Sequence, residues 1–209
     1  MAYTNLGTLL EEDGRPQDSL EYFARALELK PDSAEAHVDL GGALRATGKN
    51  AEALAQYEWA LRLRPNYAVA NYNRGIALAA LGRDPEAIAA YRAAIQFRPE
   101  YARLAETHYD LGVLLAAGGQ MTEAIAQLTE AVRLRPDYPA AQNNLGNALS
   151  AVGRNEEAVA RYQEALRFHP EDRQVRHNLA LLLHAMGRER EAMEQLKLSQ
   201  APPPPTVPH

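Results

Sequence analysis

Small and large apolar residues recur along the chain at helical spacing, and the pattern itself repeats. In each repeat a small residue is followed four positions later by a large one, and offsets of three and four place side chains on one face of an α-helix. The small residues are Ser19, Ala53, Ala87, Ala124, Ala158 and Ala192, and the large ones are Phe23, Tyr57, Tyr91, Leu128, Tyr162 and Leu196. A second apolar stripe lies upstream of the first in each repeat, and it includes Leu10, Leu44, Leu78, Leu115, Leu149 and Leu183. Each repeat therefore predicts two helices that pack against each other.

Glycine and proline report one common period. The glycines of the first predicted helices, Gly7, Gly41, Gly75, Gly112 and Gly146, are spaced 34, 34, 37 and 34 residues apart. Pro31, Pro65, Pro99, Pro136 and Pro170 show the same four intervals. A further glycine follows each first helix, where it can adopt a left-handed conformation, and the proline ends the second helix. Asn50, Asp84 and Asn155 follow two residues after such a glycine, and we expect them to cap the second helices.

This pattern of Leu-Gly, Ala, a large residue, Ala and Pro resembles the tetratricopeptide repeat. The resemblance implies an all-α protein, a right-handed α-solenoid of about six tandem helix-turn-helix repeats whose first helices line a concave groove. We expect repeats at 1–33, 34–67, 68–101, 102–138, 139–172 and 173–200, followed by an extended proline-rich tail or linker at 201–209. The first repeat lacks its opening position, so we expect a segment of a longer protein.

The interval of 37 residues contains three extra residues between Pro99 and Gly112. We expect residues Tyr101 to Ala105 to extend the first helix of the fourth repeat, since three residues add about 4.5 Å of helix. An insertion tolerated at a turn is the favoured interpretation. A local change in the pitch of the solenoid is the alternative.

Charge and composition exclude several classes of function. The formal net charge of −5 provides no basic surface for nucleic acid. The chain has no cysteine and so no disulfide, thiol nucleophile or thiolate metal site. The apolar stretches are much shorter than the roughly 18–20 residues of a membrane span, and no secretory signal is visible. We expect a cytoplasmic protein without membrane insertion.

Catalytic and metal motifs are missing from the sequence. The serines lie outside any Gly-x-Ser-x-Gly motif, and no phosphate-binding glycine loop is present. His177 and His184 are seven residues apart, which is wider than the usual pair of metal ligands on a helix. His37 and His108 occupy equivalent positions in two repeats and are interpreted as packing residues. We expect no enzyme, no cofactor and no metal site.

Six asparagine or aspartate residues precede the Leu-Gly pairs at one register. This ladder consists of Asn5, Asp39, Asn73, Asp110, Asn144 and Asn178. These residue types are disfavoured inside helices because they compete for backbone hydrogen bonds, so their recurrence needs a reason. One interpretation is that they bond to a neighbouring repeat and set the stacking register. The other is that their amides, which both donate and accept, hold the backbone of an extended peptide.

The ladder resembles the asparagines that bind peptide backbone in the tetratricopeptide superhelix of O-linked N-acetylglucosamine transferases. It is also shared with bacterial repeat scaffolds. The resemblance extends directly to the four asparagines and less well to Asp39 and Asp110, whose carboxylates cannot donate. The two-carboxylate clamp of cochaperones would need Lys and Arg where Thr4, Val38, Tyr72, Tyr109, Asn143 and His177 stand.

The remaining groove residues predict the chemistry of the partner. Glu11, Glu12, Glu35, Glu106 and the two ladder aspartates outnumber the single base Arg45, which favours basic or neutral segments. Tyr72, Ile76, Tyr109 and Val113 are expected to form an apolar central patch.

We therefore expect a protein-protein interaction scaffold that binds an extended peptide or partner segment in its groove. A regulatory or substrate-selecting arm of a larger enzyme, such as a glycosyltransferase, is the alternative. Self-association through the ends of the solenoid is a third possibility.

Overall fold

A computed structural model describes residues 2–97 and 103–200, and within them the regular structure consists of twelve α-helices and no strand. The first helices of the repeats are α1 (Ala2–Glu12), α3 (Ala34–Ala46), α5 (Ala68–Ala80), α7 (Leu104–Ala117), α9 (Pro139–Ala151) and α11 (Arg173–Ala185). The second helices are α2 (Pro16–Leu29), α4 (Asn50–Leu63), α6 (Asp84–Phe97), α8 (Met121–Leu134), α10 (Asn155–Phe168) and α12 (Glu189–Gln200). The predicted all-α helical repeat fold is confirmed.

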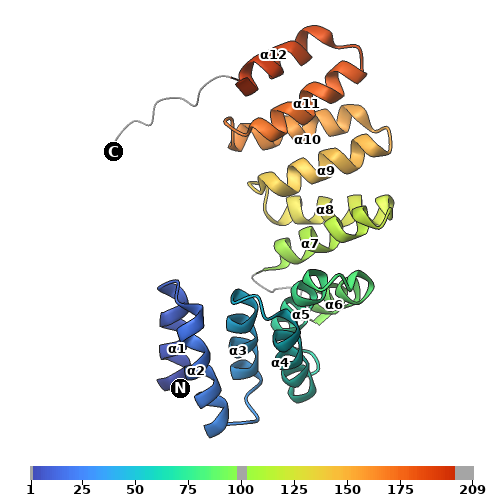
Figure 1. Cartoon of the computed structure of the whole chain (residues 1–209). Coiled ribbons are helices and arrows are strands. Elements are labelled where there is room, and N and C mark those ends of the chain that lie inside the picture. The colour runs from blue at the N-terminus through green and yellow to red at the C-terminus, as the bar shows by residue number, and fades with distance from the viewer. Residues whose placement is uncertain (1, 98–102, 201–209) are drawn as a thin grey trace. The chain divides into compact units, whose positions relative to one another are not determined.

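Contacts divide the chain into two compact units, Met1–Thr107 and His108–His209. Within each unit, consecutive helices lie side by side (Figure 1). First helices also contact one another, as α1 does α3, α3 does α5 and α9 does α11. The first helices therefore form one side of each stack. We call their outward surface the first-helix face, formed by α1, α3 and α5 in unit 1 and by α9, α11 and the part of α7 from His108 onward in unit 2.

Glycine ends the first helices as predicted, but the caps of the second helices differ from the prediction. Gly48 has a φ of +80°, and the Lys49 N–H returns to the carbonyl of Leu44 at 2.9 Å, the backbone motif expected at such an end. This tight turn makes Lys49 the N-cap, so that Asn50 is the first residue of α4. Asn155 and Asp84 likewise begin α10 and α6. The expected capping by these residues was wrong.

The large residue of each second helix packs against the glycine of its own first helix. A Cβ atom on Gly41 would lie 2.5 Å from Cε1 of Tyr57, and one on Gly146 would lie 2.7 Å from Cε1 of Tyr162. These distances are far below van der Waals contact, so only glycine permits the observed approach. Tyr57 is fully buried as a result.

Helix α7 contains 14 residues, whereas α5 and α9 contain 13. Its additional residue lies at the N-terminal end, in the direction of the predicted extension. Arg103 is in a turn before the helix. The rest of the predicted extension, Tyr101 and Ala102, lies outside the described residues, as do Pro99 and the tail at 201–209.

A polar bridge at one register joins the two helices of a repeat to the preceding turn. His37 lies 2.8 Å from Oε1 of Gln56 through Nδ1 and 3.1 Å from the Pro31 carbonyl through Nε2. His108 makes the equivalent contact with Gln127 at 2.7 Å. These histidines have the packing role that their equivalent positions predicted.

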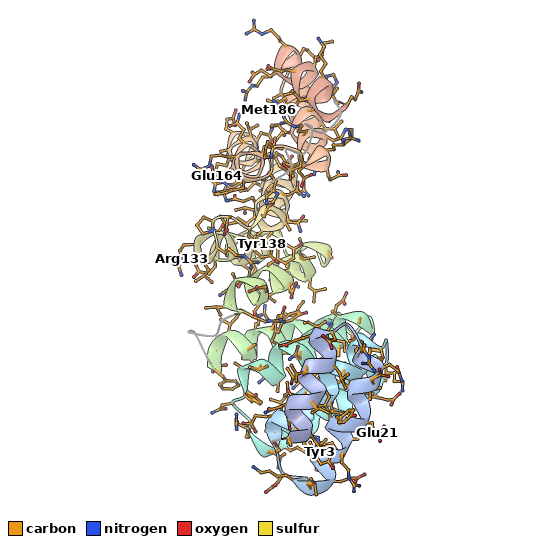
Figure 2. All side chains as sticks on the ribbon, turned by 90° about the vertical axis from the view of Figure 1, so that its left-hand side faces the viewer. Tyr3, Glu21, Arg133, Tyr138, Glu164 and Met186 are labelled. Carbon is orange, nitrogen blue, oxygen red and sulfur yellow. The ribbon has the colours of Figure 1, made fainter. Side chains whose placement is uncertain are left out.

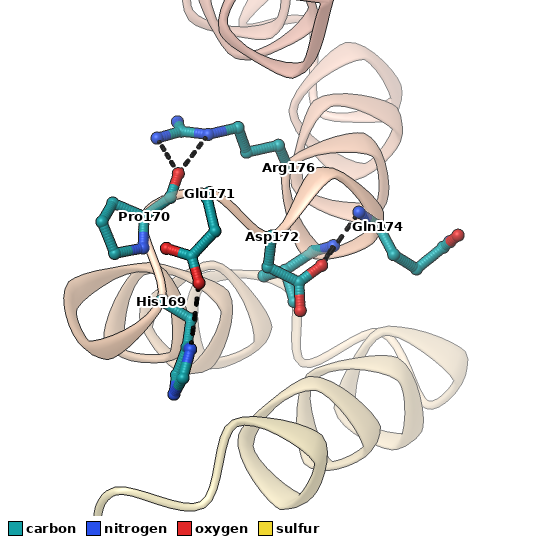
Figure 3. Close-up of polar contacts among 7 residues, drawn as sticks. His169, Pro170, Glu171, Asp172, Gln174 and Arg176 are labelled. Atoms are coloured by element: carbon teal, nitrogen blue, oxygen red, sulfur yellow. Dashed lines mark hydrogen bonds and ion pairs between the residues drawn. The ribbon is translucent and has the colours of Figure 1, made fainter. Parts of the chain in front are cut away.

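In repeat six an arginine takes the same role. Arg176 donates to the Pro170 carbonyl at 3.0 and 2.6 Å (Figure 3) and to Gln195 at 3.0 Å. Asp172 caps α11 in the same turn by accepting from the backbone N–H groups of Gln174 and Val175.

Candidate functional site

All six ladder residues lie on first helices. Asn5 is exposed, and the other five are partly buried near the middle of their helices. Asn5, Asp39 and Asn73 belong to unit 1, and Asp110, Asn144 and Asn178 belong to unit 2. The ladder is therefore described as two sets of three residues, each on its own first-helix face.

In unit 2 the asparagines of the ladder bond to the preceding repeat. Asn144 Nδ2 donates to the Tyr109 hydroxyl at 3.1 Å, and Asn178 Nδ2 donates to Asn143 Oδ1 at 2.9 Å. Gln174 Nε2 also donates to Asn178 Oδ1 at 3.0 Å. These bonds match the interpretation in which the ladder fixes the stacking register.

In unit 1 the asparagine of the third repeat has no such partner. The residue 35 positions upstream is the hydrogen-bonding partner of Asn144 and Asn178, but for Asn73 that residue is Val38, which has no polar side-chain atom. No residue in the described part of the chain hydrogen-bonds the Asn73 side chain. Its amide therefore remains available to a ligand on a partly buried surface.

The carboxylates of unit 1 gather on the first-helix face beside the ladder. Burial, followed by the charge of Glu35, raises the pKa of Asp39 to about 6. Burial also raises the pKa of Glu11, and Asp39 adds to this effect while Arg45 opposes it. Glu35 itself forms an ion pair with Arg64, and its own backbone N–H and this guanidinium lower its pKa. Glu11 and Asp39 are therefore carboxylates on this face whose charged forms are disfavoured by burial.

The four residues of the predicted apolar patch differ in exposure. Tyr72 is 5% exposed, and its ring lies 5.9 Å from that of Tyr91. This side chain is therefore part of the packed interior and not of an exposed patch. Tyr109 is partly buried, with its ring 4.9 Å from that of Tyr138. Ile76 and Val113 are partly buried on α5 and α7, as is Glu106 at the start of α7.

Two pockets of unit 2 share Asn144 in their lining. A pocket of about 530 Å³ is lined by the Tyr109 and Tyr138 rings, with Asn143 and Asn144 among its polar residues. A second pocket of about 340 Å³ is more apolar. Its lining comprises Val113, Ala116, Met121, Leu128, Asn144, Asn147, Ala148 and Ala151. Asn144 thus belongs to two hollows that could receive side chains of an extended segment.

Sequence reasoning missed part of this lining because it considered first helices alone. Tyr138 and His169 come from the turns that precede α9 and α11, yet both line the larger pocket. Figure 3 shows His169 beside Glu171 in the turn that Asp172 caps, with Nδ1 of His169 3.2 Å from the carboxylate. The recurrence of a tyrosine two residues after Pro65, Pro99 and Pro136, at Tyr67, Tyr101 and Tyr138, was the available signal.

The second helices present a different, charged surface. Arg133 on α8 and Glu164 on α10 project from the same side of unit 2 (Figure 2). They pair with Glu130 at 2.5 Å and Arg167 at 2.7 Å within their own helices. Such exposed ion pairs contribute little to stability, and their charges are balanced locally.

The outermost helices expose apolar side chains. Leu6 and Leu9 of α1 are 46% and 57% exposed, and Met193 of α12 is 57% exposed. None of the described helices combines the length and the hydrophobicity of a membrane span. Across the described residues, no group of three His, Asp or Glu side chains is arranged to hold a metal ion.

Comparison with solved structures identifies proteins of the same fold. The chain is 23% identical to YrrB, described as a TPR protein with an unusual peptide-binding site, with a TM-score of 0.75 over 85% of this chain and 90% of that one. PilF of Pseudomonas aeruginosa is 20% identical with a TM-score of 0.84 over 95% and 90%. MamA of Desulfovibrio magneticus RS-1 is 22% identical with a TM-score of 0.72 over 82% and 95%.

Comparison with curated protein sequences finds no match. Family profiles described as tetratricopeptide repeat match residues 1–66 and 39–102, and a TPR repeat profile matches 114–153 and 151–187. These matches together cover helices of both units. The chain belongs to the tetratricopeptide repeat family.

Proposed function

We propose that this protein is a non-enzymatic interaction scaffold that holds an extended segment of a partner on its first-helix face. The observation that carries the proposal is the Asn73 side chain, a partly buried amide in the middle of α5 with no hydrogen bond to any described residue. An unpaired amide inside a helix lowers helix propensity. A peptide backbone supplies both a donor and an acceptor that would satisfy the hydrogen-bonding groups of this amide.

The surroundings of the ladder support an extended ligand. Asn144 keeps part of its hydrogen-bonding capacity after its bond to Tyr109, and it lines two pockets. Backbone contact by amides together with side-chain pockets at intervals is the usual way in which proteins hold extended peptides. YrrB, which has the same fold, is described as having a peptide-binding site.

The charge of unit 1 favours a basic or neutral segment. Glu11 and Asp39 both lie on its first-helix face, and burial disfavours their charged forms. A cationic peptide would relieve that cost, whereas an acidic one would increase it. We therefore expect lysine-containing peptides to bind more tightly than glutamate-containing peptides of equal length, and the preference to weaken with added salt.

Asn73→Ala and Asn144→Ala should have different effects. Asn73→Ala removes an amide without a partner and improves helix propensity by up to about 0.7 kcal/mol, so the melting temperature should hold or rise while peptide binding weakens. Asn144→Ala removes the bond to Tyr109 and should cost about 1 kcal/mol of stability before that gain is counted. Fluorescence anisotropy with a labelled lysine-containing peptide, beside thermal unfolding, measures both.

Gln163→Ala serves as the control, because Gln163 is an exposed amide on α10 and lies off the first-helix face. Loss of stability in Asn73→Ala with unchanged affinity would contradict the peptide-binding role of this residue. It would favour a role in stacking instead.

A further inference from the structure

Repeat five contains an internal example of a tyrosine satisfied by an amide. Tyr162 of α10 passes beside Gly146, and its hydroxyl donates to Oδ1 of Asn147 at 2.6 Å. Asn147 is the residue directly after that glycine on α9 and is exposed. A buried tyrosine hydroxyl is therefore completed by an amide oxygen on the first-helix face.

Repeat two has the same tyrosine but lacks the amide. Tyr57 is 0% exposed and lies against Gly41 as Tyr162 lies against Gly146. The residue in the place of Asn147 is Gly42, and a Cβ atom built there meets no other atom within 4 Å. The Tyr57 hydroxyl is buried and forms no well-aligned hydrogen bond with a described residue, although the Arg45 guanidinium lies close enough to lower its pKa. An unmade bond of this kind is costly, and native proteins seldom leave one without a reason.

A second buried donor lies close to the Tyr57 hydroxyl. The Nε of Arg45 is also buried and also lacks a partner in the described part of the chain. Burial raises the pKa of Tyr57 to about 12. The Arg45 guanidinium lowers this pKa through its charge and its hydrogen-bonding contact, and the charge of Glu11 raises it further. Both charged groups therefore lie near the hydroxyl. We call this cluster of Gly42, Arg45, Tyr57, Glu11 and Asp39 the Gly42 gap.

The chemistry of the Gly42 gap selects among possible side chains of a ligand. An ammonium or guanidinium group would meet Arg45 and could not accept from the two buried donors. A carboxylate could accept from them, but Glu11 and Asp39 would repel it. A carboxamide has an oxygen that accepts and an NH₂ group that donates, so it can satisfy the donors and the carboxylates together.

We propose that the Gly42 gap is a subsite for the side-chain amide of an asparagine or glutamine in the bound segment. The amide oxygen takes the place that Asn147 Oδ1 has in repeat five, and the NH₂ group faces Glu11 and Asp39. The subsite rests on the proposed function, since it is one position along the same first-helix face. Rotation of Arg45 opens it, because no ion pair with a described residue holds this side chain and its Nε has no hydrogen-bond partner among them.

The first arm of the test needs no ligand. Gly42→Asn supplies the missing amide and should raise the melting temperature more than Gly42→Ala, which adds helix propensity without an acceptor. The additional rise in melting temperature of Gly42→Asn over Gly42→Ala should disappear in a Tyr57→Phe background, since the hydroxyl is then gone. Equal effects of the two Gly42 variants, or an excess that persists in Tyr57→Phe, would overturn the geometry.

The second arm measures binding of three otherwise identical extended peptides that carry Gln, Glu or Met at one position. Wild type should prefer the Gln peptide about tenfold, which corresponds to about 1.4 kcal/mol. Gly42→Asn and Tyr57→Phe should each abolish the preference while the peptides still bind. Asn73→Ala should weaken all three peptides alike.

The outcomes separate the two proposals. Equal affinity for the three peptides, with Asn73→Ala still weakening them, would overturn the subsite and leave the proposed function standing. Binding that does not depend on Asn73 or on the first-helix face would overturn both.

Discussion

Gly41→Ala should destabilise unit 1 by about 1–3 kcal/mol, whereas Gly42→Ala, one residue later, should stabilise it by about 0.5–1 kcal/mol. A Cβ atom on Gly41 would lie 2.5 Å from Cε1 and 2.9 Å from Cζ of Tyr57. Tyr57 is fully buried and cannot move aside without disturbing the helix pair. At Gly42 the same methyl group would enter open space, so the gain in helix propensity is all that remains.

Urea unfolding monitored by circular dichroism measures both free energies of unfolding. Gly146→Ala is a second test of the same contact, because its Cβ would lie 2.7 Å from Tyr162. Changes of the same sign and size at Gly41 and Gly42 would contradict the packing described for the second-helix tyrosines.

Asp39→Asn should stabilise the protein at neutral pH and lose this effect in acid. The folded pKa of Asp39 is about 6, above the ordinary value of 3.8, chiefly because the carboxyl is buried. Folding therefore favours its protonated form. Below pH 3.8 the carboxyl is protonated in both states and does not lower the stability of the fold. Stability falls as pH rises from 3.8 to about 6, and above about pH 6 the loss of stability is constant.

Asparagine removes that cost, and it is the residue found at this register in four of the six repeats. With allowance for partial exposure, we expect a gain of about 1–2 kcal/mol near neutral pH. Chemical unfolding across the acidic range should show the difference between variant and wild type shrinking toward zero as pH falls. Glu86→Gln is a control whose effect on stability should have the opposite sign, because Arg83 lowers the pKa of this exposed carboxyl. A gain for Asp39→Asn that is independent of pH would show that burial of charge is not its cause.

Features that depend on a single residue or a short segment could be predicted from the sequence. Gly14 and Gly48 have φ values of +73° and +80°, because the backbone at the end of the first helix requires a conformation that only glycine adopts easily. Tyr57 and Gly41 also recur at fixed positions of the repeat, although their contact was not predicted and depends on the close approach of two helices. The glycine turns are a local consequence of the repeated pattern.

The hydrogen bonds of the ladder could not be predicted from the ladder residues alone. Asn144 and Asn73 occupy equivalent positions in the sequence, yet Asn144 hydrogen-bonds Tyr109, whereas the equivalent residue for Asn73 is the apolar Val38. The difference depends on the residue 35 positions upstream in the preceding repeat. The missed caps have a similar origin, since the tight turn after Gly48 moved the start of α4 to Asn50.

The most direct test of the peptide-binding claim is an NMR titration that follows the side-chain amides of Asn5, Asn73, Asn144 and Asn178. An unlabelled lysine-containing extended peptide is added to isotope-labelled protein. We predict saturable shifts of these amides, largest for Asn73, while amides on the second helices, such as that of Gln163, remain unchanged. Saturable shifts confined to second-helix residues, with the ladder amides unmoved, would contradict the account.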